Sequence, residues 1–167
     1  MGAWRHLRAI LLLPGVVTLI VPTLIVWRAG VDVGWGLPDG LALLPVLLGV
    51  ALVGLGLGLV VWTVTLLATV GQGTLAPWDS TSRLVVHGPY RQVRNPMISG
   101  VASLLAGEVA LLGSLPLLLW FAAVVAVNAL YLPLVEEPGL RRRFGEDYEV
   151  YRANVPRWVP RRRPWEP

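Results

Sequence analysis

"LALLPVLLGVALVGLGLGLVVWTVTLLATV", residues 41–70, is an uninterrupted apolar stretch that carries no charged side chain. A helix of about 20 mostly apolar residues is enough to cross a hydrocarbon core about 30 Å thick. The stretch is therefore long enough to span a membrane with some tilt, or to extend beyond its surface. It predicts a membrane helix.

The rest of the chain follows the same pattern. With 55% hydrophobic and only 14% charged residues, its 167 residues provide too little polar surface for an ordinary soluble domain. Three more apolar stretches qualify as helices, at 9–27, 97–113 and 116–135, and "GSLP" at 113–116 is the expected break between the last two. The predicted fold class is all-α. We expect a single integral membrane domain, 1–167, with about four transmembrane helices and a C-terminal amphipathic cytoplasmic helix.

Two prolines, Pro14 and Pro22, lie within the first apolar stretch. Proline is tolerated in a membrane helix when neighbouring helices compensate for the lost backbone hydrogen bonds. We expect a kinked helix that is retained, because no clean signal-peptide cleavage site follows it.

The arginines predict the orientation. Basic residues are retained on the cytoplasmic side, and all fourteen here are arginines, eight of them after residue 136. Arg5 and Arg8 precede the first apolar stretch, whereas the connection 28–40 has more aspartate than arginine. Four passes with both termini cytoplasmic fit this distribution, and we expect the protein in a bacterial plasma membrane. A single helix over 97–135, the alternative, would export the arginine-rich tail.

Several function classes are disfavoured. The chain contains no cysteine and two histidines, which excludes disulfides and thiolate metal sites and argues against any metal site. It has no G-x-x-x-x-G-K phosphate loop. The formal charge of +4 is attributed to topology and anionic headgroups rather than to nucleic-acid binding.

Gly54 and Gly58 form a G-x-x-x-G spacing, which lets a second helix approach closely. That second helix belongs either to the same monomer or to a second copy in a homodimer. Both alternatives are open at this point.

Two polar segments, 83–96 and 136–160, are expected on the cytoplasmic side. An antiparallel hairpin places the start of its first helix beside the end of its second, so Arg91 and Arg94 should meet Glu136 and Glu137. The glutamates need such partners because a helix C-terminus disfavours carboxylates. On charge alone, a salt-bridge collar at the membrane surface explains the same residues.

The second polar segment also carries an aromatic stripe. Leu140, Phe144, Tyr148 and Tyr151 follow one another at spacings of four, four and three, which places them on one face of a helix. Such a helix would lie along the membrane surface or cover the charged cluster. Trp158 and Trp165, together with Tyr151, are expected to anchor the tail at the interface.

The stretches "GPYRQVRNPMISG" (88–100) and "EEPGLRRRFGEDYEVYRANVPRWVP" (136–160) together resemble the isoprenylcysteine carboxyl methyltransferase and phospholipid methyltransferase superfamily of membrane enzymes. The resemblance covers residues 73–160. It implies methyl transfer from S-adenosylmethionine, bound between the last two helices and the tail. The implied acceptor is the carboxylate or amine of a lipid or small hydrophobic molecule, entering from the bilayer.

The resemblance also implies the site. Arg94 and Glu137 are the predicted catalytic residues, with Glu136 an alternative base for an amine acceptor. An arginine suits the carboxylate of the donor, and glutamates suit its amino group. The predicted cofactor-binding residues are His87, Gly88, Pro89, Tyr90, Arg94, Asn95 and Pro96 on one wall, and Glu136, Glu137, Leu140, Phe144 and Tyr148 on the other.

Two positions depart from the family pattern. Asn95 stands where many members have histidine, and asparagine cannot titrate near neutral pH. Ile98 stands where tyrosine is common, which removes a hydroxyl and a stacking surface. Both departures argue against prenylated protein tails as the acceptor.

Polar residues within the apolar regions are candidate acceptor contacts. Glu108, Asn128 and Tyr131 are assigned this role, and the alternative for the first two is a hydrogen bond between neighbouring helices. Two other functions stay open for the chain as a whole. One is a membrane reductase of related architecture that binds NADPH, and the other is a non-catalytic membrane protein that retains the fold.

Overall fold

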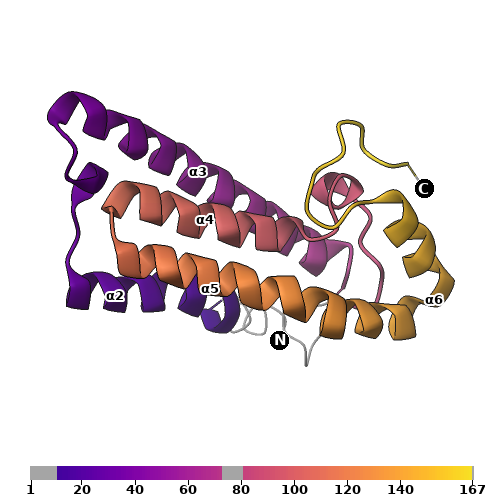
Figure 1. The fold of residues 1–167 in the computed structure, drawn as a ribbon. Helices are drawn as coiled ribbons and strands as arrows, with labels where there is room; N and C mark the ends of the chain where they lie inside the picture. The colour runs from indigo at the N-terminus through magenta and orange to yellow at the C-terminus, as the bar shows by residue number, and fades with distance from the viewer. Residues whose placement is uncertain (1–10, 73–80, 167) are drawn as a thin grey trace.

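A computed structural model of the chain describes residues 11–72 and 81–166. All regular secondary structure in these two ranges is helical, which confirms the all-α prediction for them. The long helices run side by side along one axis of the molecule (Figure 1). In chain order the elements are the π-helix η1 (Leu11–Ile20), α2 (Val21–Ala29), the 3-10 helix η2 (Val33–Gly36), α3 (Asp39–Thr69), the 3-10 helix η4 (Gly88–Arg91), α4 (Pro96–Leu112), α5 (Leu115–Tyr131), the π-helix η5 (Leu132–Glu136) and α6 (Glu137–Asn154).

Three helical stretches in the described ranges are long and apolar enough to cross a membrane: Pro14–Gly36, Gly40–Thr69 and Leu115–Asn154. The fourth predicted span, α4, has 17 residues and is therefore about 25 Å long, short of the hydrocarbon thickness. Arg5, Arg8 and the first two residues of the predicted span 9–27 lie outside the described residues.

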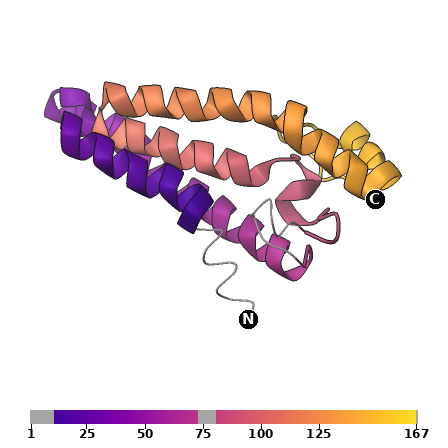
Figure 2. The ribbon, with the colours of Figure 1, turned by 90° about the horizontal axis from the view of Figure 1, so that it is seen from below.

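The helix α4 forms the centre of the bundle. It contacts α3, α5 and η1 and lies between α3 and α5 in the ribbon, as a second view also shows (Figures 1 and 2). Seven of its residues are buried, whereas α3 and α5 expose many leucines and valines. Because its neighbours cover it, α4 needs less apolar length than a helix surrounded by lipid.

Glycines bring α3 and α4 into backbone contact. A Cβ atom added at Gly56 would stand 2.7 Å from Gly100 O, and one added at Gly107 would stand 2.8 Å from Gly49 O. Gly54 and Gly58, the pair that the sequence singled out, have no atom within 4 Å of an added Cβ. Neither glycine of that pair therefore makes a close contact with a second helix among the described residues. Gly49 and Gly56, seven residues apart, make the close contacts with α4 instead.

The prolines change the helix type in the first span. Residues Leu11–Ile20, with Pro14 inside, are π-helical, and the α-helical form begins at Val21, one residue before Pro22. Thr18 Oγ1 donates a hydrogen bond of 2.7 Å to Pro14 O. A wider helical turn thus accommodates the missing amide donor, where the sequence predicted a kink.

The predicted break between the last two apolar stretches is present. Gly113 adopts a left-handed conformation with φ of 53°, and α4 and α5 form an antiparallel hairpin around it (Figure 1). A single helix over 97–135 is therefore excluded.

The last helix does not end at residue 135. It continues from Leu115 to Asn154, with the π-turn η5 around Pro133. Gly145, at φ 55° and ψ −127°, bends α6 sharply, and the second half of α6 turns back toward the start of α4 (Figure 1). Glu136 and Glu137 consequently lie inside a continuous helix, so the expected conflict with a helix C-terminus does not arise.

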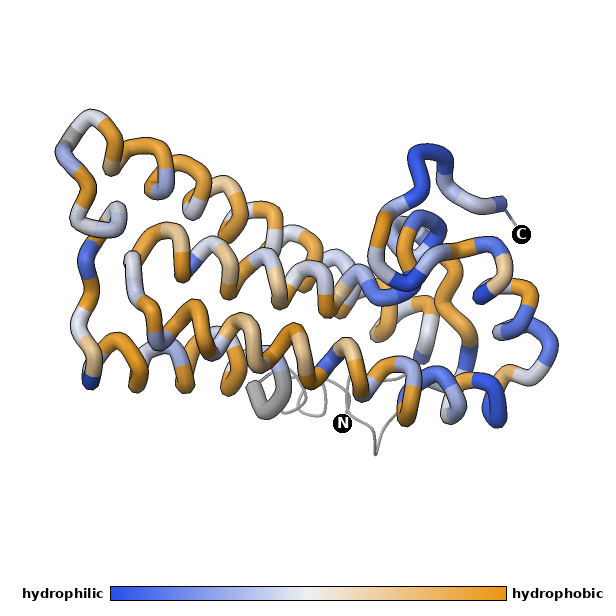
Figure 3. The backbone as a smooth tube through the Cα atoms, viewed as in Figure 1, coloured by the Kyte–Doolittle hydropathy of each residue, from blue (hydrophilic) through white to orange (hydrophobic). Residues whose placement is uncertain are grey.

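The polar residues gather at the end of the bundle where α6 lies. Figure 3 shows mostly apolar residues along the long helices and hydrophilic ones on α6 and the C-terminal tail. This end is where the two motif segments meet.

Candidate functional site

A cavity of about 350 Å³ lies at the polar end of the bundle. Its walls come from the end of α3, the segment 81–98, the end of α5 with η5, and α6. Eight of the predicted site residues line it, from both motif halves: Tyr90, Arg94, Asn95, Tyr131, Glu136, Leu140, Phe144 and Tyr148. The two stretches of the resemblance thus form one concave site, although about 40 residues separate them.

Five predicted cofactor contacts do not line this cavity: Glu137, which faces a cluster of arginines, and four residues of the segment 87–96. His87 is exposed, and Gly88 lies against α3, where an added Cβ would meet the Trp62 ring at 2.9 Å. Pro89 and Pro96 are buried, the latter as the first residue of α4. These residues shape the segment 87–96 rather than the cavity wall.

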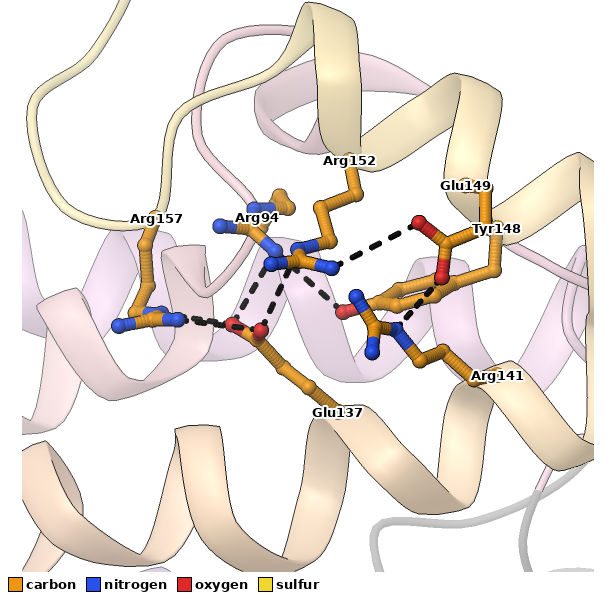
Figure 4. Close-up of polar contacts among 7 residues, drawn as sticks. All are labelled: Arg94, Glu137, Arg141, Tyr148, Glu149, Arg152 and Arg157. Carbon is orange, nitrogen blue, oxygen red and sulfur yellow. Dashed lines mark hydrogen bonds and ion pairs between the residues drawn. The ribbon is translucent and has the colours of Figure 1, made fainter.

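Glu137 is surrounded by arginines (Figure 4). Arg157 binds it with both ends of its guanidinium group, Nε to Oε1 at 2.6 Å and Nη2 to Oε2 at 3.0 Å. Arg94 Nη1 lies 3.1 Å from Oε1, and Arg152 Nε lies 3.7 Å from Oε2. The Glu137 side chain is only 9% exposed. Its hydrogen bond to Arg157 raises the pKa of that guanidinium above its ordinary value.

The predicted pairing of Arg94 with the acidic pair is therefore present, but that of Arg91 is wrong. Arg91 points instead to the C-terminal tail, where its Nε donates 2.7 Å to Trp165 O and its Nη2 lies 2.9 Å from Glu166 Oε1. Within the segment 91–94, Arg94 therefore pairs with α6 and Arg91 pairs with the C-terminal tail.

Two polar groups at the cavity remain without a partner among the described residues. Arg94 Nε is buried and makes no hydrogen bond, and Glu136 makes no hydrogen bond or ion pair there. Arg94 Nη1 also donates to Tyr148 OH at 3.4 Å. Arg94 and Glu136, which both line the cavity, therefore keep hydrogen-bonding capacity that no described residue uses.

Tyr90 is a neutral phenol in this site. Burial, with the nearby Glu136 carboxylate as a second cause, raises the pKa of its hydroxyl above the ordinary value. Its backbone carbonyl accepts a 2.7 Å hydrogen bond from Tyr151 OH. Tyr90 thus links the cavity wall to α6.

The aromatic stripe is divided by the bend at Gly145. Leu140 and Phe144 precede the bend and Tyr148 and Tyr151 follow it, yet all four line the cavity. The segment therefore covers the charged cluster, which is one of the two placements predicted for it.

Of the residues expected to anchor the tail at the interface, Tyr151 is buried and Trp165 is partly buried against it. Tyr151 is 3% exposed, and it packs in one apolar cluster with Tyr148 and Val155. The Trp165 ring lies 6.0 Å from the Tyr151 ring, centroid to centroid. Trp158 differs, since it is 39% exposed, and its anchoring role stays a prediction.

The two polar candidates inside the bundle are not brought together. Asn128 Nδ2 donates 2.9 Å to Val124 O on its own helix, and Glu108 Oε2 is buried without a hydrogen-bond partner in the described ranges. Glu108 lies four residues from the far end of α4, away from the cavity. Of the three predicted acceptor contacts only Tyr131 reaches the cavity.

Arg152 and Arg157 are the site residues that sequence reasoning missed. Their signal was weak, because both stand among eight arginines of one tail. Thr81, Leu84 and Val85 also line the cavity, and they come from a connection without a recognisable motif.

The fold and the site define a helical membrane protein with a charged, aromatic-walled cavity at one end. A model of the phospholipid methyltransferase family matches residues 44–147, more than half of the chain. The chain therefore belongs to this family, within the superfamily of membrane methyltransferases that its motifs resemble. No curated protein and no solved structure matches it. Together with the three long apolar helices, membership makes the chain an integral membrane protein, and it implies methyltransferase activity in general.

Proposed function

We propose that this protein transfers a methyl group from S-adenosylmethionine to a lipophilic acceptor at the membrane. The acceptor would be the carboxylate or amine of a lipid or of a small hydrophobic molecule. The observation that carries the proposal is the cavity in which Arg94 and Glu136 both stand with unused polar capacity.

The residues fit this cofactor in charge and in size. S-adenosylmethionine carries a carboxylate, an amino group and a sulfonium cation. A buried arginine donor suits the carboxylate, and an unpartnered glutamate suits a cation. A cavity of about 350 Å³ is at the small end of ligand sites, about 300 to 1,000 Å³. It therefore suits one cofactor-sized molecule together with only the reactive end of an acceptor.

When bound, the cofactor supplies an electrophilic methyl group. Arg94 would hold the donor's carboxylate, while its Nη1 stays with Glu137. Phe144, Tyr148 and Tyr151 would exclude water, since they cover the cavity from α6. Alignment of donor and acceptor is the main task of such a site, because the displacement needs the reacting atoms in line.

The proposed base is Glu136 rather than Glu137. Three arginines already engage Glu137, whereas Glu136 lines the cavity. A carboxylate acceptor needs no base, but an amine acceptor must lose a proton in order to react, and Glu136 is placed to receive it.

The acceptor side of the cavity is apolar. Met97 and Ile98 line it from the start of α4, and Tyr131 and Val135 line it from the end of α5 and from η5. Ile98, where the family often has tyrosine, extends this apolar wall. A hydrophobic tail in the bilayer could therefore lie beside these residues with its reactive group inside.

The membrane topology is part of the same proposal. Four passes, with α4 as the enclosed short one, and both termini cytoplasmic would put the site at the cytoplasmic surface. The whole chain would form one membrane domain. The distribution of arginines supports this orientation.

Calorimetry on the detergent-purified protein is the direct test, with S-adenosylmethionine and NADPH as the two ligands. We expect the wild type to bind S-adenosylmethionine, and Arg94→Ala to lose that binding. Binding of NADPH alone would indicate a reductase instead. A folded wild type that binds neither ligand would refute the enzyme and favour a non-catalytic protein.

The acceptor can then be found by mass spectrometry. Lipid extracts incubated with the protein and a methyl-labelled donor should yield a labelled lipophilic product, and the Arg94→Ala protein should not produce it.

A further inference from the structure

The chain after α6 crosses back over the motif segment 91–94. We call residues 155–166 the C-terminal strap. Its backbone bonds to that segment three times: Arg94 N donates to Pro156 O at 2.9 Å, Arg161 N to Gln92 O at 3.0 Å, and Trp165 N to Arg91 O at 2.8 Å. The strap lies outside the residues matched by the family model, which end at 147.

Two apolar contacts fix the ends of the strap. Val155 is 1% exposed and belongs to the cluster of Tyr148 and Tyr151. Trp165 packs against the same cluster from the other end. The strap is therefore a packed part of the polar end and has a defined path across it.

Two consecutive strap residues converge on Arg94. Pro156 holds the Arg94 backbone through its carbonyl oxygen. Arg157 binds Glu137 through two short hydrogen bonds, and Glu137 in turn binds the Arg94 guanidinium at 3.1 Å (Figure 4). Pro156 and Arg157 thus hold both the backbone and the side chain of Arg94.

We propose that the C-terminal strap is a clasp for the methyl-transfer site and that Arg157 is its positioning residue. Arg157 holds Glu137 in the orientation that directs Arg94 into the cavity, and it does not line the cavity itself. This inference rests on the function proposed above, because it assigns Arg94 to the cofactor.

Loss of Arg157 should loosen Arg94 without unfolding the protein. Glu137 would keep Arg94 and Arg152 as partners, so no buried carboxylate is left unpaired. It would lose its bidentate partner, however, and bidentate pairing is what fixes a carboxylate in one orientation.

The experiment uses the full chain in lipid nanodiscs and compares three variants with the wild type. Arg157→Ala removes the clasp, and Arg157→Lys retains the cation without the planar pair of donors. Arg162→Ala is the matched control, since Arg162 is an exposed arginine of the same strap. We measure the dissociation constant of S-adenosylmethionine, the midpoint of thermal unfolding, and hydrogen exchange at the Arg94 amide.

We expect Arg157→Ala to weaken S-adenosylmethionine binding about tenfold, the scale of one hydrogen-bonded charged contact, and to speed exchange at the Arg94 amide. Arg157→Lys should recover part of the affinity, and Arg162→Ala should match the wild type. A purely structural role would lower the unfolding midpoint of Arg157→Ala and leave the affinity of the folded protein unchanged.

The outcomes separate this inference from the proposed function. Wild-type binding that Arg157→Ala retains in full would overturn the clasp and leave the methyltransferase proposal standing. A wild type that binds no S-adenosylmethionine would overturn the function and the positioning role together. Should Arg157→Ala fail to fold, Trp165→Ala releases the other end of the strap without touching Glu137, and unchanged affinity and exchange in that folded variant would overturn the clasp.

Discussion

Two adjacent glutamates have different surroundings in this site. Glu136 ends the π-helix η5 and Glu137 begins α6, and successive residues of a helix point in different directions around its axis. Three arginines bind Glu137, and Glu136 lines the cavity without an ion pair among the described residues. The contacts of Glu137 thus give it a structural role, whereas Glu136 is available to a ligand.

Glu136→Gln tests the available carboxylate. The substitution keeps size and shape but removes the charge that would attract a cationic group, so S-adenosylmethionine affinity should fall about tenfold or more. The unfolding midpoint should stay near that of the wild type, because Glu136 has no ion pair to lose. Calorimetry and thermal unfolding of the same sample give both numbers, and an unchanged affinity would contradict the assignment.

Glu137→Ala should instead lower the stability of the protein. It leaves a cluster of partly buried guanidinium groups without their counter-ion, and breaking a buried pair in this way costs on the order of 3 kcal/mol. We expect a clearly lower unfolding midpoint, with Glu136→Ala as the matched control that stays close to wild type. Equal midpoints for the two variants would show that the arginine cluster does not stabilise the fold.

At this scale the sequence predicted which motif residues meet, but not how they divide their roles. The resemblance correctly brought Arg94, Tyr148 and the acidic pair together. It could not separate Glu136 from Glu137, because that depends on where Arg152 and Arg157 lie after the bend in α6. Arg91 was assigned to the acidic pair, but its partner is Glu166 in the C-terminal tail, and the motifs do not predict where the tail lies.

Single glycines decide how the helices bend and pack. Gly145 has φ 55° and ψ −127°, a backbone conformation that is open to glycine and strained for residues with a Cβ atom. An added Cβ would meet no atom within 4 Å, so any cost of substitution comes from the backbone.

Gly145→Ala should therefore destabilise the protein by about 1–3 kcal/mol and displace Tyr148 and Tyr151 from the cavity. The readouts are the unfolding midpoint and S-adenosylmethionine affinity. Gly58→Ala serves as control, because Gly58 is equally open but lies within the regular helix α3. Loss of stability in both variants alike would rule out the bend as the cause.

Gly56→Ala tests the contact between α3 and α4. The new methyl group would stand 2.7 Å from the backbone oxygen of Gly100, and overpacking of this kind typically costs about 1–3 kcal/mol. Gly54→Ala, two residues away on an open face, should be neutral. Thermal unfolding in one detergent compares them, and a neutral Gly56→Ala would mean that the two helices can separate at little cost.

Element positions were predictable because apolar stretches of membrane length have few alternatives to a helix. The boundaries of the helices were harder to predict. Pro133 and Pro138 flank the acidic pair and read as the end of a helix, yet the π-turn η5 accommodates the first, and the second stands in the first turn of α6. The choice of Gly49 and Gly56 over Gly54 and Gly58 depends on which face α4 covers, which spacing alone does not reveal.

The whole molecule is polarised along its length. Apolar helices occupy most of it, and hydrophilic residues concentrate on α6 and the C-terminal tail at one end (Figure 3), the end where the cavity lies. The connection between α2 and α3 lies at the opposite end (Figure 1). A membrane across the apolar part would thus separate the cavity from that connection.

The absence of cysteine makes the orientation easy to test. We expect Arg162→Cys to react with a membrane-impermeant maleimide only after cells are permeabilised, and Val33→Cys, whose native side chain is 64% exposed, to react in intact cells. The cysteine-free parent is the blank. Labelling of both positions from the same side would contradict the odd number of passes expected between them and would require a different topology.

The strap also sets an order of events during biosynthesis. Ribosomes make a chain from its N-terminus, so the apolar helices α2 to α5 are complete before Pro156 and Arg157 exist. Membrane insertion of these helices can precede any contact that fastens Arg94. A nascent chain stopped after α5 would thus be inserted without the contacts that fasten Arg94, so the proposed methyl transfer could not start on a partly made protein.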